Sequence, residues 1–127
     1  MAIRTELSLR IQNSPGALSH ICQQLSEGRV NILALNLETG GTLRLIVDNP
    51  LHAVGILKDH KHSVERRDVL IIHLPNDPGS LEKASALLSN AGVNIDYAYG
   101  SAVEDHSMAS VVASVEDPQR AAMAAGV

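Results

Sequence analysis

Apolar and polar residues alternate along the chain with two different periods. Residues 7–11 read Leu-Ser-Leu-Arg-Ile, an alternation that predicts a strand with one buried face. After Pro15 the apolar residues recur at helical spacing, and Gly28 is expected to end that helix. The apolar stripe consists of Ala17, Leu18, Ile21, Cys22 and Leu25. Two more strands are expected over residues 32–38 and 42–47, joined by a Gly40-Gly41 turn.

Proline marks the expected beginnings of the helices. Ser14 is expected to cap the first helix and Pro15 to open it, because proline at the first helical position loses an N–H that has no partner there. A second helix is expected to begin at Asn49-Pro50, and a fourth strand near residues 64–67. The order of elements is then βαββαβ.

The chain repeats this pattern. The segment Asn-Ser-Pro-Gly-Ala-Leu at 13–18 recurs 63 positions later as Asn-Asp-Pro-Gly-Ser-Leu at 76–81, and Val-Asn-Ile at 30–32 recurs at 93–95. Asp-Asn-Pro at 48–50 corresponds to Glu-Asp-Pro at 116–118, an offset of 68, so the second copy has a hairpin longer by five residues. Three ordered matches predict two copies of one small module.

A βαββαβ module of this size predicts an α+β fold of two ferredoxin-like modules in tandem. We assign residues 1–67 to module 1 and 68–127 to module 2. In each we expect an antiparallel sheet of order 4-1-3-2, with both helices on one face. Only nine residues follow Pro118, so module 2 is predicted to lack its last strand.

That missing strand would leave residues 69–74 as an open sheet edge. The segment reads Val-Leu-Ile-Ile-His-Leu and carries neither the charge nor the proline that protects natural edges. We expect it to be covered by residues 64–67 of another chain, or by its own copy in a homodimer.

Composition excludes several classes of protein. The 127 residues carry a net charge of −4 and two tyrosines, with no Phe or Trp, which argues against nucleic-acid binding. A single cysteine, Cys22, excludes an intrachain disulfide, and the N-terminus does not resemble a signal peptide. No apolar run is long enough to span a membrane. We expect a soluble protein of the cytoplasm.

Catalytic and metal chemistry have little support. The six histidines recur in neither copy of the motif and have no acid or nucleophile at fixed spacing. His60 and His62 form a possible metal pair, but a solvated loop is the favoured interpretation. Cys22 lies on an apolar helix stripe, where a small buried hydrophobe is the default. The sequence therefore predicts no enzyme, no metal and no cofactor.

The duplicated Pro-Gly turn is the remaining candidate site. A turn between a strand and a helix presents free backbone N–H groups and the positive end of the helix dipole, which favours a carboxylate. Asn13 and Asn76 precede the two turns, and an amide can match both ends of an amino acid. The alternative is structural, since asparagine can brace a turn and glycine can permit one.

These residues resemble the ACT domain family, regulatory modules of enzymes in amino-acid metabolism. The resemblance is carried by residues 76–81 and 90–95, Asn-Ala-Gly-Val-Asn-Ile, and by their first-copy equivalents. It implies amino-acid binding between two ACT units, with ligand contacts at Asn13, Gly16, Asn31, Asn76, Gly79 and Asn94. Some members carry a polar residue two positions before the loop asparagine, where this chain has Ile11 and Leu74.

Two functions follow from the resemblance. The first is a freestanding sensor that binds an amino acid, forms a homodimer and reports to a separate enzyme or regulator. The second is a scaffold for dimerisation or docking, whose ligand pockets are vestigial.

Overall fold

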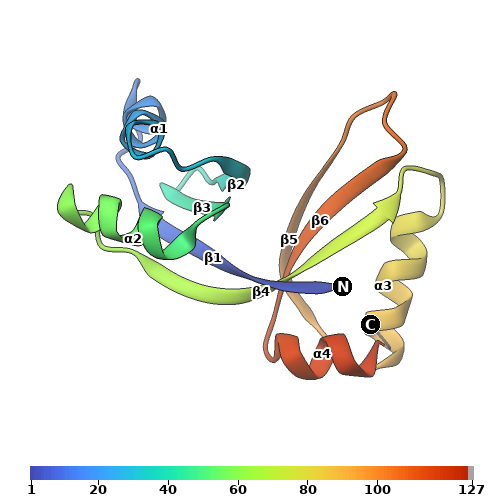
Figure 1. The fold of residues 1–127 in the computed structure, drawn as a ribbon. Coiled ribbons are helices and arrows are strands. Elements are labelled where there is room, and N and C mark those ends of the chain that lie inside the picture. The colour runs from blue at the N-terminus through green and yellow to red at the C-terminus, as the bar shows by residue number, and fades with distance from the viewer. Residues whose placement is uncertain (126–127) are drawn as a thin grey trace. The chain divides into compact units, whose positions relative to one another are not determined.

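The computed structural model describes residues 1–125, which form six strands and four helices (Figure 1). In chain order they are β1 (Ala2–Arg10), α1 (Ala17–Glu27), β2 (Ile32–Leu37), β3 (Thr42–Val47), α2 (Pro50–Asp59), β4 (Glu65–Pro75), α3 (Ser80–Asn90), β5 (Ile95–Ala102), β6 (Met108–Val115) and α4 (Pro118–Ala124). The α+β fold with a repeated βαββαβ order is confirmed. One strand, β4, replaces the two consecutive strands that were expected at the junction of the copies.

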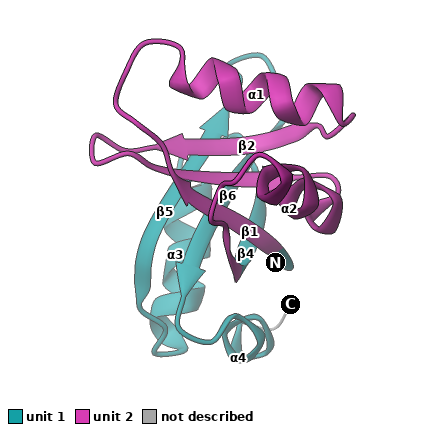
Figure 2. Cartoon of the chain, turned by 90° about the vertical axis from the view of Figure 1, so that its left-hand side faces the viewer, with its two compact units in different colours: residues 1–4, 68–127 teal, residues 5–67 magenta. Residues whose placement is uncertain are grey.

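The chain divides into two compact units (Figure 2). The first copy comprises Thr5–Arg67, and the second comprises Asp68 onward together with Met1–Arg4. The strand order is β2-β3-β1-β4-β6-β5, so that β1 and β4 are hydrogen-bonded neighbours. Within the first copy, the residues of β4 up to Arg67, then β1, β3 and β2, give the predicted order 4-1-3-2.

The prediction of an open edge at β4 is wrong. In the strand order β4 lies between β1 and β6, and the first four residues of the chain group with the second copy. Met1 packs against the apolar core of that copy. The N-terminal part of β1 therefore takes the place of the fourth strand, although the sequence-based division assigned these residues to module 1. Helix α4 is the last element within residues 1–125.

Each copy packs both helices against one face of its own strands. The first core combines Leu7, Leu9, Leu43, Leu45 and Val47 from strands with Ile21, Leu25, Ala53, Val54 and Leu57 from helices. The second core combines Leu70, Ile72, Leu74, Ala113 and Val115 with Ala84, Leu88, Ala121 and Ala122. Alternate residues of each strand contribute, because successive side chains of a strand point to opposite faces. Cys22 lies partly buried on α1 as a free thiol.

The four proline-marked helices begin in two different ways. In α2 and α4 the proline opens the helix, and the preceding side chain caps it: Asn49 Oδ1 accepts from His52 N at 3.3 Å, and Asp117 Oδ1 accepts from Arg120 N at 3.0 Å. In α1 and α3 the expected start at the proline is wrong. There a glycine with positive φ occupies the N-cap, Gly16 at 85° and Gly79 at 87°, and no side chain caps the helix.

Helix α1 ends at Gly28 as expected, and in both copies the residue in the left-handed conformation follows the C-cap. Gly28 caps α1 with an ordinary φ of −84°, and the left-handed residue is the next one, Arg29, at 61°. In the second copy the equivalent residue is Gly92, at 72°. Gly28 packs closely against Ile56, and a Cβ at position 28 would require the end of the Ile56 side chain to move. The left-handed turn is thus made by an arginine in one copy and a glycine in the other.

A buried polar pair joins α1 to the segment before β4. His62 Nε2 lies 3.2 Å from Oε1 of Gln24, whose side chain is almost fully buried. Partial burial lowers the pKa of His62 below 6.5, and the nearby His60 and His20 lower it further. Folding therefore favours the neutral form of the His62 side chain over the protonated form.

Exchanging the left-handed residues tests this account of the helix ends. Arg29→Gly should raise the free energy of unfolding by about 1 kcal/mol, because the left-handed conformation is costly for a residue with a Cβ. Gly92→Ala should lower it by about 1 kcal/mol, and a Cβ at position 92 meets no atom within 4 Å, so the cost is in the backbone. Urea unfolding measures both changes; equal stability of all three proteins would contradict the assignment.

The His62 pair predicts a dependence of stability on pH. When the folded-state pKa is depressed, the unfolded chain binds more protons, so stability should fall as the pH drops through 6.5 toward the folded-state pKa. In His62→Gln this part of the decline should disappear, while urea unfolding at neutral pH changes little. The titration of the His62 ring by NMR gives the direct check, and a midpoint at or above 6.5 would contradict the burial argument.

Candidate ligand site

The corner where β4 meets α3 is the candidate site of the second copy. The chain leaves β4 at Pro75, turns with Ser80 N donating to Asp77 O at 3.2 Å, and enters α3 after Gly79. The first turn of an α-helix has N–H groups without intrahelical partners, and these attract anions. The corner thus presents backbone donors beside the carboxylate of Asp77, whose side chain is exposed.

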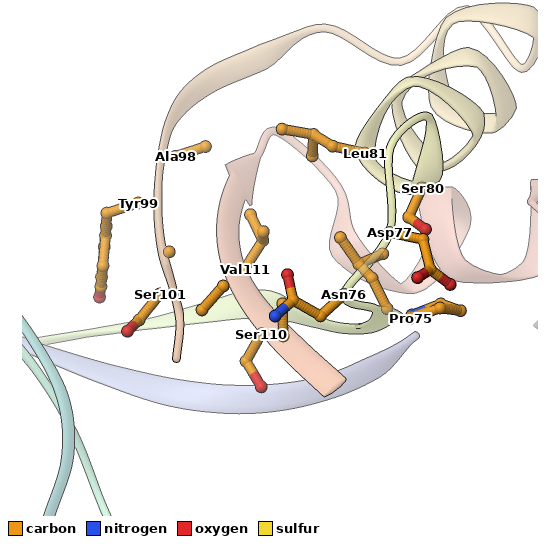
Figure 3. Close-up of a pocket in the computed structure, with 14 residues that line it drawn as sticks. Pro75, Asn76, Asp77, Ser80, Leu81, Ala98, Tyr99, Ser101, Ser110 and Val111 are labelled. Atoms are coloured by element: carbon orange, nitrogen blue, oxygen red, sulfur yellow. The ribbon is translucent and has the colours of Figure 1, made fainter. Parts of the chain in front are cut away.

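A cavity of about 440 Å³ opens beside this corner (Figure 3). Leu81 of α3 and Ala98 of β5 point toward one another across it, and Val111 lies between them (Figure 3). The other lining residues are Leu74, Pro75, Asn76, Asp77, Ser80, Tyr99, Gly100, Ser101, Ala102, Ala109 and Ser110. The volume is within the range of small-molecule sites. Apolar side chains form most of the interior, and the polar groups gather at the loop and the strand ends.

Small residues on one face of β5 leave room for this cavity. Ala98 pairs with Ala113 and Gly100 with Val111, and residues paired across antiparallel strands point to the same face. Ala113 is in the core beneath the helices, so Ala98 and Gly100 lie on the helix side of the sheet. The opposite face of β5 carries Tyr97 and Tyr99, whose parallel rings stack with centroids 6.5 Å apart.

Asn76 braces the loop as well as lining the cavity. Its Nδ2 donates to Val103 O at 3.1 Å and to His106 O at 3.0 Å, and its backbone N donates to Ser107 O at 2.9 Å. Both amide hydrogens are therefore used to hold the long β5–β6 hairpin against the corner. The side-chain oxygen of Asn76 is the atom left for a ligand, and it can only accept.

The six sequence-predicted residues fall into two sets. Asn76 lines the cavity of the second copy, and Gly79 follows Asp77 and Pro78 as the N-cap of α3. Asn13 and Gly16 line a smaller cavity of about 170 Å³ at the equivalent corner of the first copy. Asn94 and Asn31 precede β5 and β2, and neither lines the cavity of its own copy.

Topology explains why those two asparagines lie apart from the corners. Each helix carries the chain back along the sheet, so the next strand begins at the end away from the loop. Asn31 is held there by Asp48: its N donates to Asp48 Oδ1 at 3.0 Å, and its O accepts from Asp48 N at 3.1 Å. Within one copy, the structure therefore does not bring Asn31 to Gly16.

The residues that shape the cavity were not predicted from the sequence. Ala98 and Gly100 have no functional group in their side chains, so no sequence motif indicates them. The available signal was the repeat, because the residues 63 positions earlier are Leu35 and Leu37. Comparing the copies position by position would have shown the loss of bulk on this strand.

The first copy has another hollow, which shares the β1–α1 loop with the smaller cavity. Its volume is about 490 Å³, and the basic side chains Arg10, His20 and His62 line it with the β1–α1 loop. The guanidinium of Arg10 donates to Gly40 O at 2.7 Å. In residues 1–125 no three His, Cys, Asp or Glu side chains are grouped to hold a metal ion. Across the same residues, no helix is long and apolar enough to cross a membrane.

The comparisons with known proteins agree with this architecture. The family model described as an ACT domain pair matches residues 1–124. The crystal structure of protein BT0572 from Bacteroides thetaiotaomicron is 32% identical, with a TM-score of 0.88 over 96% of this chain and 85% of that one. No curated protein matches the chain.

More distant structures share the fold. The ligand-free regulatory subunit of aspartate kinase from Thermus thermophilus is 18% identical, with a TM-score of 0.72 over 98% of this chain and 92% of that one. The corresponding subunit from Thermus flavus is 16% identical, with a TM-score of 0.68 over 98% and 93%. Family model, fold and repeated corner motif together establish that the chain belongs to the ACT domain family, as a pair of ACT domains.

Proposed function

We propose that this protein is a sensor of amino-acid metabolism, which binds a free amino acid and regulates a separate protein without catalysing a reaction. The observation that carries the proposal is the 440 Å³ cavity beside the β4–α3 corner. It joins an apolar interior to helix N–H donors and a carboxylate. Structural similarity to regulatory subunits of aspartate kinase supports a regulatory role.

The corner offers a partner for each charged end of an amino acid. The first N–H groups of α3 would receive the α-carboxylate, because the helix dipole and the unpaired donors both favour an anion there. The carboxylate of Asp77 and the oxygen of Asn76 would accept from the α-ammonium group. Gly79 permits the turn that brings these groups together, since its φ of 87° is unfavourable for other residues.

The remaining predicted contacts belong to the same proposal. Asn13 and Gly16 would act at the corresponding corner of the first copy. Asn31 and Asn94 would contribute from a neighbouring ACT unit, as the family resemblance implies. We also retain the cytoplasm as the location, because a single cysteine suits a reducing compartment.

Association with other chains is proposed at the outer strand of the first copy. With β4 covered, β2 is one end of the strand order, and it carries no charged residue. Leu33, Leu35 and Leu37 on this strand are 42–49% exposed. A bare apolar edge favours pairing with a second copy in a homodimer, or with the regulated protein. The same observation supports the alternative function, a scaffold without a ligand.

A thermal-shift panel of the twenty amino acids separates sensor from scaffold. A ligand at 100 times its Kd adds about 2.7 kcal/mol to the free energy of unfolding, so at least one amino acid should raise the Tm clearly. For that amino acid, Asp77→Asn should weaken binding by about 1.5–3 kcal/mol, because it removes a charged acceptor. Asp96→Asn, an exposed carboxylate in β5 outside the cavity lining, is the matched control.

Calorimetry distinguishes the outcomes. Loss of affinity in Asp77→Asn with normal affinity in Asp96→Asn supports the corner as the site. A panel in which no amino acid changes the Tm would contradict the sensor function and leave the scaffold.

A further inference from the structure

The two copies have the same corner backbone and different cavities. Gly16 and Gly79 adopt φ of 85° and 87°, and each is followed by an eleven-residue helix. On the side of the strand that follows the helix, the adjoining cavity is about 170 Å³ in the first copy, where Leu37 lines it, and about 440 Å³ in the second, where Ala98 and Gly100 line it. On this side the two copies differ in the side chains of that strand and in the longer hairpin of the second copy.

Four paired positions on the helix side of the sheet have lost bulk in the second copy. Leu35 pairs with Leu45 and Leu37 with Leu43 in the first copy. The equivalent pairs are Ala98 with Ala113 and Gly100 with Val111. Leu37 lines the smaller cavity, whereas Ala98 and Gly100 line the larger one. Ala98 is smaller than the leucine it replaces, and a Cβ at Gly100 would lie 2.8 Å from Ser110 O and 2.9 Å from Val111 Cγ2, so β5 has no side chain at that position.

The leucine in the first turn of the helix is more exposed in the second copy than in the first. Leu18 of α1 is partly buried and packs against the core of the first copy. Its equivalent in α3, Leu81, is 57% exposed and faces the cavity from across Ala98 (Figure 3). Apolar surface in this position gains free energy when another apolar group covers it. The second copy thus presents an apolar slot beside Ala98, at the position where the first copy carries Leu35.

We propose that the second copy alone binds a ligand, one per chain, and that this ligand is an amino acid with an uncharged apolar side chain. This inference rests on the proposed function, which assigns the contacts of the ligand's carboxylate and ammonium groups. It adds the chemical class of the ligand's side chain. The side chain lies between Leu81 and Ala98, over Val111. Among the residues that line the cavity the sole charged side chain is Asp77, which is at the loop and engages the ammonium group. A charged ligand side chain would lie against apolar surface with no oppositely charged partner among the lining residues, other than Asp77 at the loop.

Titration calorimetry of the full chain tests this inference with isoleucine, phenylalanine, aspartate and lysine as probes. Isoleucine or phenylalanine should bind with a stoichiometry of one per chain. Aspartate and lysine should bind at least tenfold more weakly or show no heat. Binding of a charged amino acid in preference would leave the proposed sensor function standing and overturn the apolar side chain. Two sites per chain would overturn the difference between the copies, and no binding by any amino acid would overturn sensor and inference together.

Two matched pairs of variants locate the site. Ala98→Leu restores the residue of the first copy and should weaken isoleucine binding at least tenfold, whereas Ala86→Leu, an exposed alanine of α3 outside the cavity lining, should change it less than twofold. Leu81→Ala should weaken binding severalfold, and Leu87→Ala, 48% exposed on the same helix and also outside the lining, should not. Both leucines are exposed, so the second pair decides even when Ala98→Leu fails to fold. Unchanged affinity in Leu81→Ala would contradict the proposed slot.

Discussion

Backbone pairing between β1 and β4 is the interaction on which both copies depend. Each strand is longer than one module needs, and each contributes residues to both compact units. The N-terminal residues of β1 supply the strand that the second copy lacks, and the N-terminal residues of β4 supply the fourth strand of the first. Strand β4 therefore has a hydrogen-bonded neighbour on each side, β1 and β6. The loop that leaves β4 at Pro75 and forms the ligand corner starts from this paired strand. A ligand site needs such support, because loops hold side chains accurately only when rigid elements carry them.

The two copies share a backbone turn and an aliphatic core, and they differ in the cavity beside the turn. In both copies the backbone turn is set by a proline followed by a glycine with positive φ, and the helix that follows packs on an aliphatic core. The first copy carries Leu35 and Leu37 on β2 and has the smaller cavity on this side of its corner. The second copy places Ala98 and Gly100 there, and its long hairpin is tied to the corner through Asn76. The loss of bulk falls on β5, at the end of the strand order, and on its neighbour β6, while Ala113 and Val115 of β6 remain buried in the core with α3 and α4.

The internal repeat made most of the fold predictable from the sequence. The features that could not be predicted are the pairing partner of β4, the left-handed residue after α1 and the cavity. Offsets of 63 and 68 residues gave the element order, the sheet order of the first copy and the longer second hairpin. The edge prediction failed because it considered only residues that follow α4, whereas the missing strand comes from the opposite end of the chain. The left-handed residue at the end of α1 was not predicted, because glycine is the usual residue in that conformation and the chain has Arg29 there, one position after the C-cap Gly28. The cavity was not predicted, because Ala98 and Gly100 have no functional group that a sequence motif could indicate.

Chemical-shift mapping by NMR tests the central claim most directly. When isoleucine is titrated into the ¹⁵N-labelled chain, we predict that the largest amide shifts occur in residues 76–81 and 98–102, on the two sides of the second-copy cavity. Residues 13–18 and 35–39, which form the same corner in the first copy, should keep their positions. Equal shifts in both corners, or shifts confined to the hollow lined by Arg10, His20 and His62, would contradict the claim that the second copy alone holds the ligand.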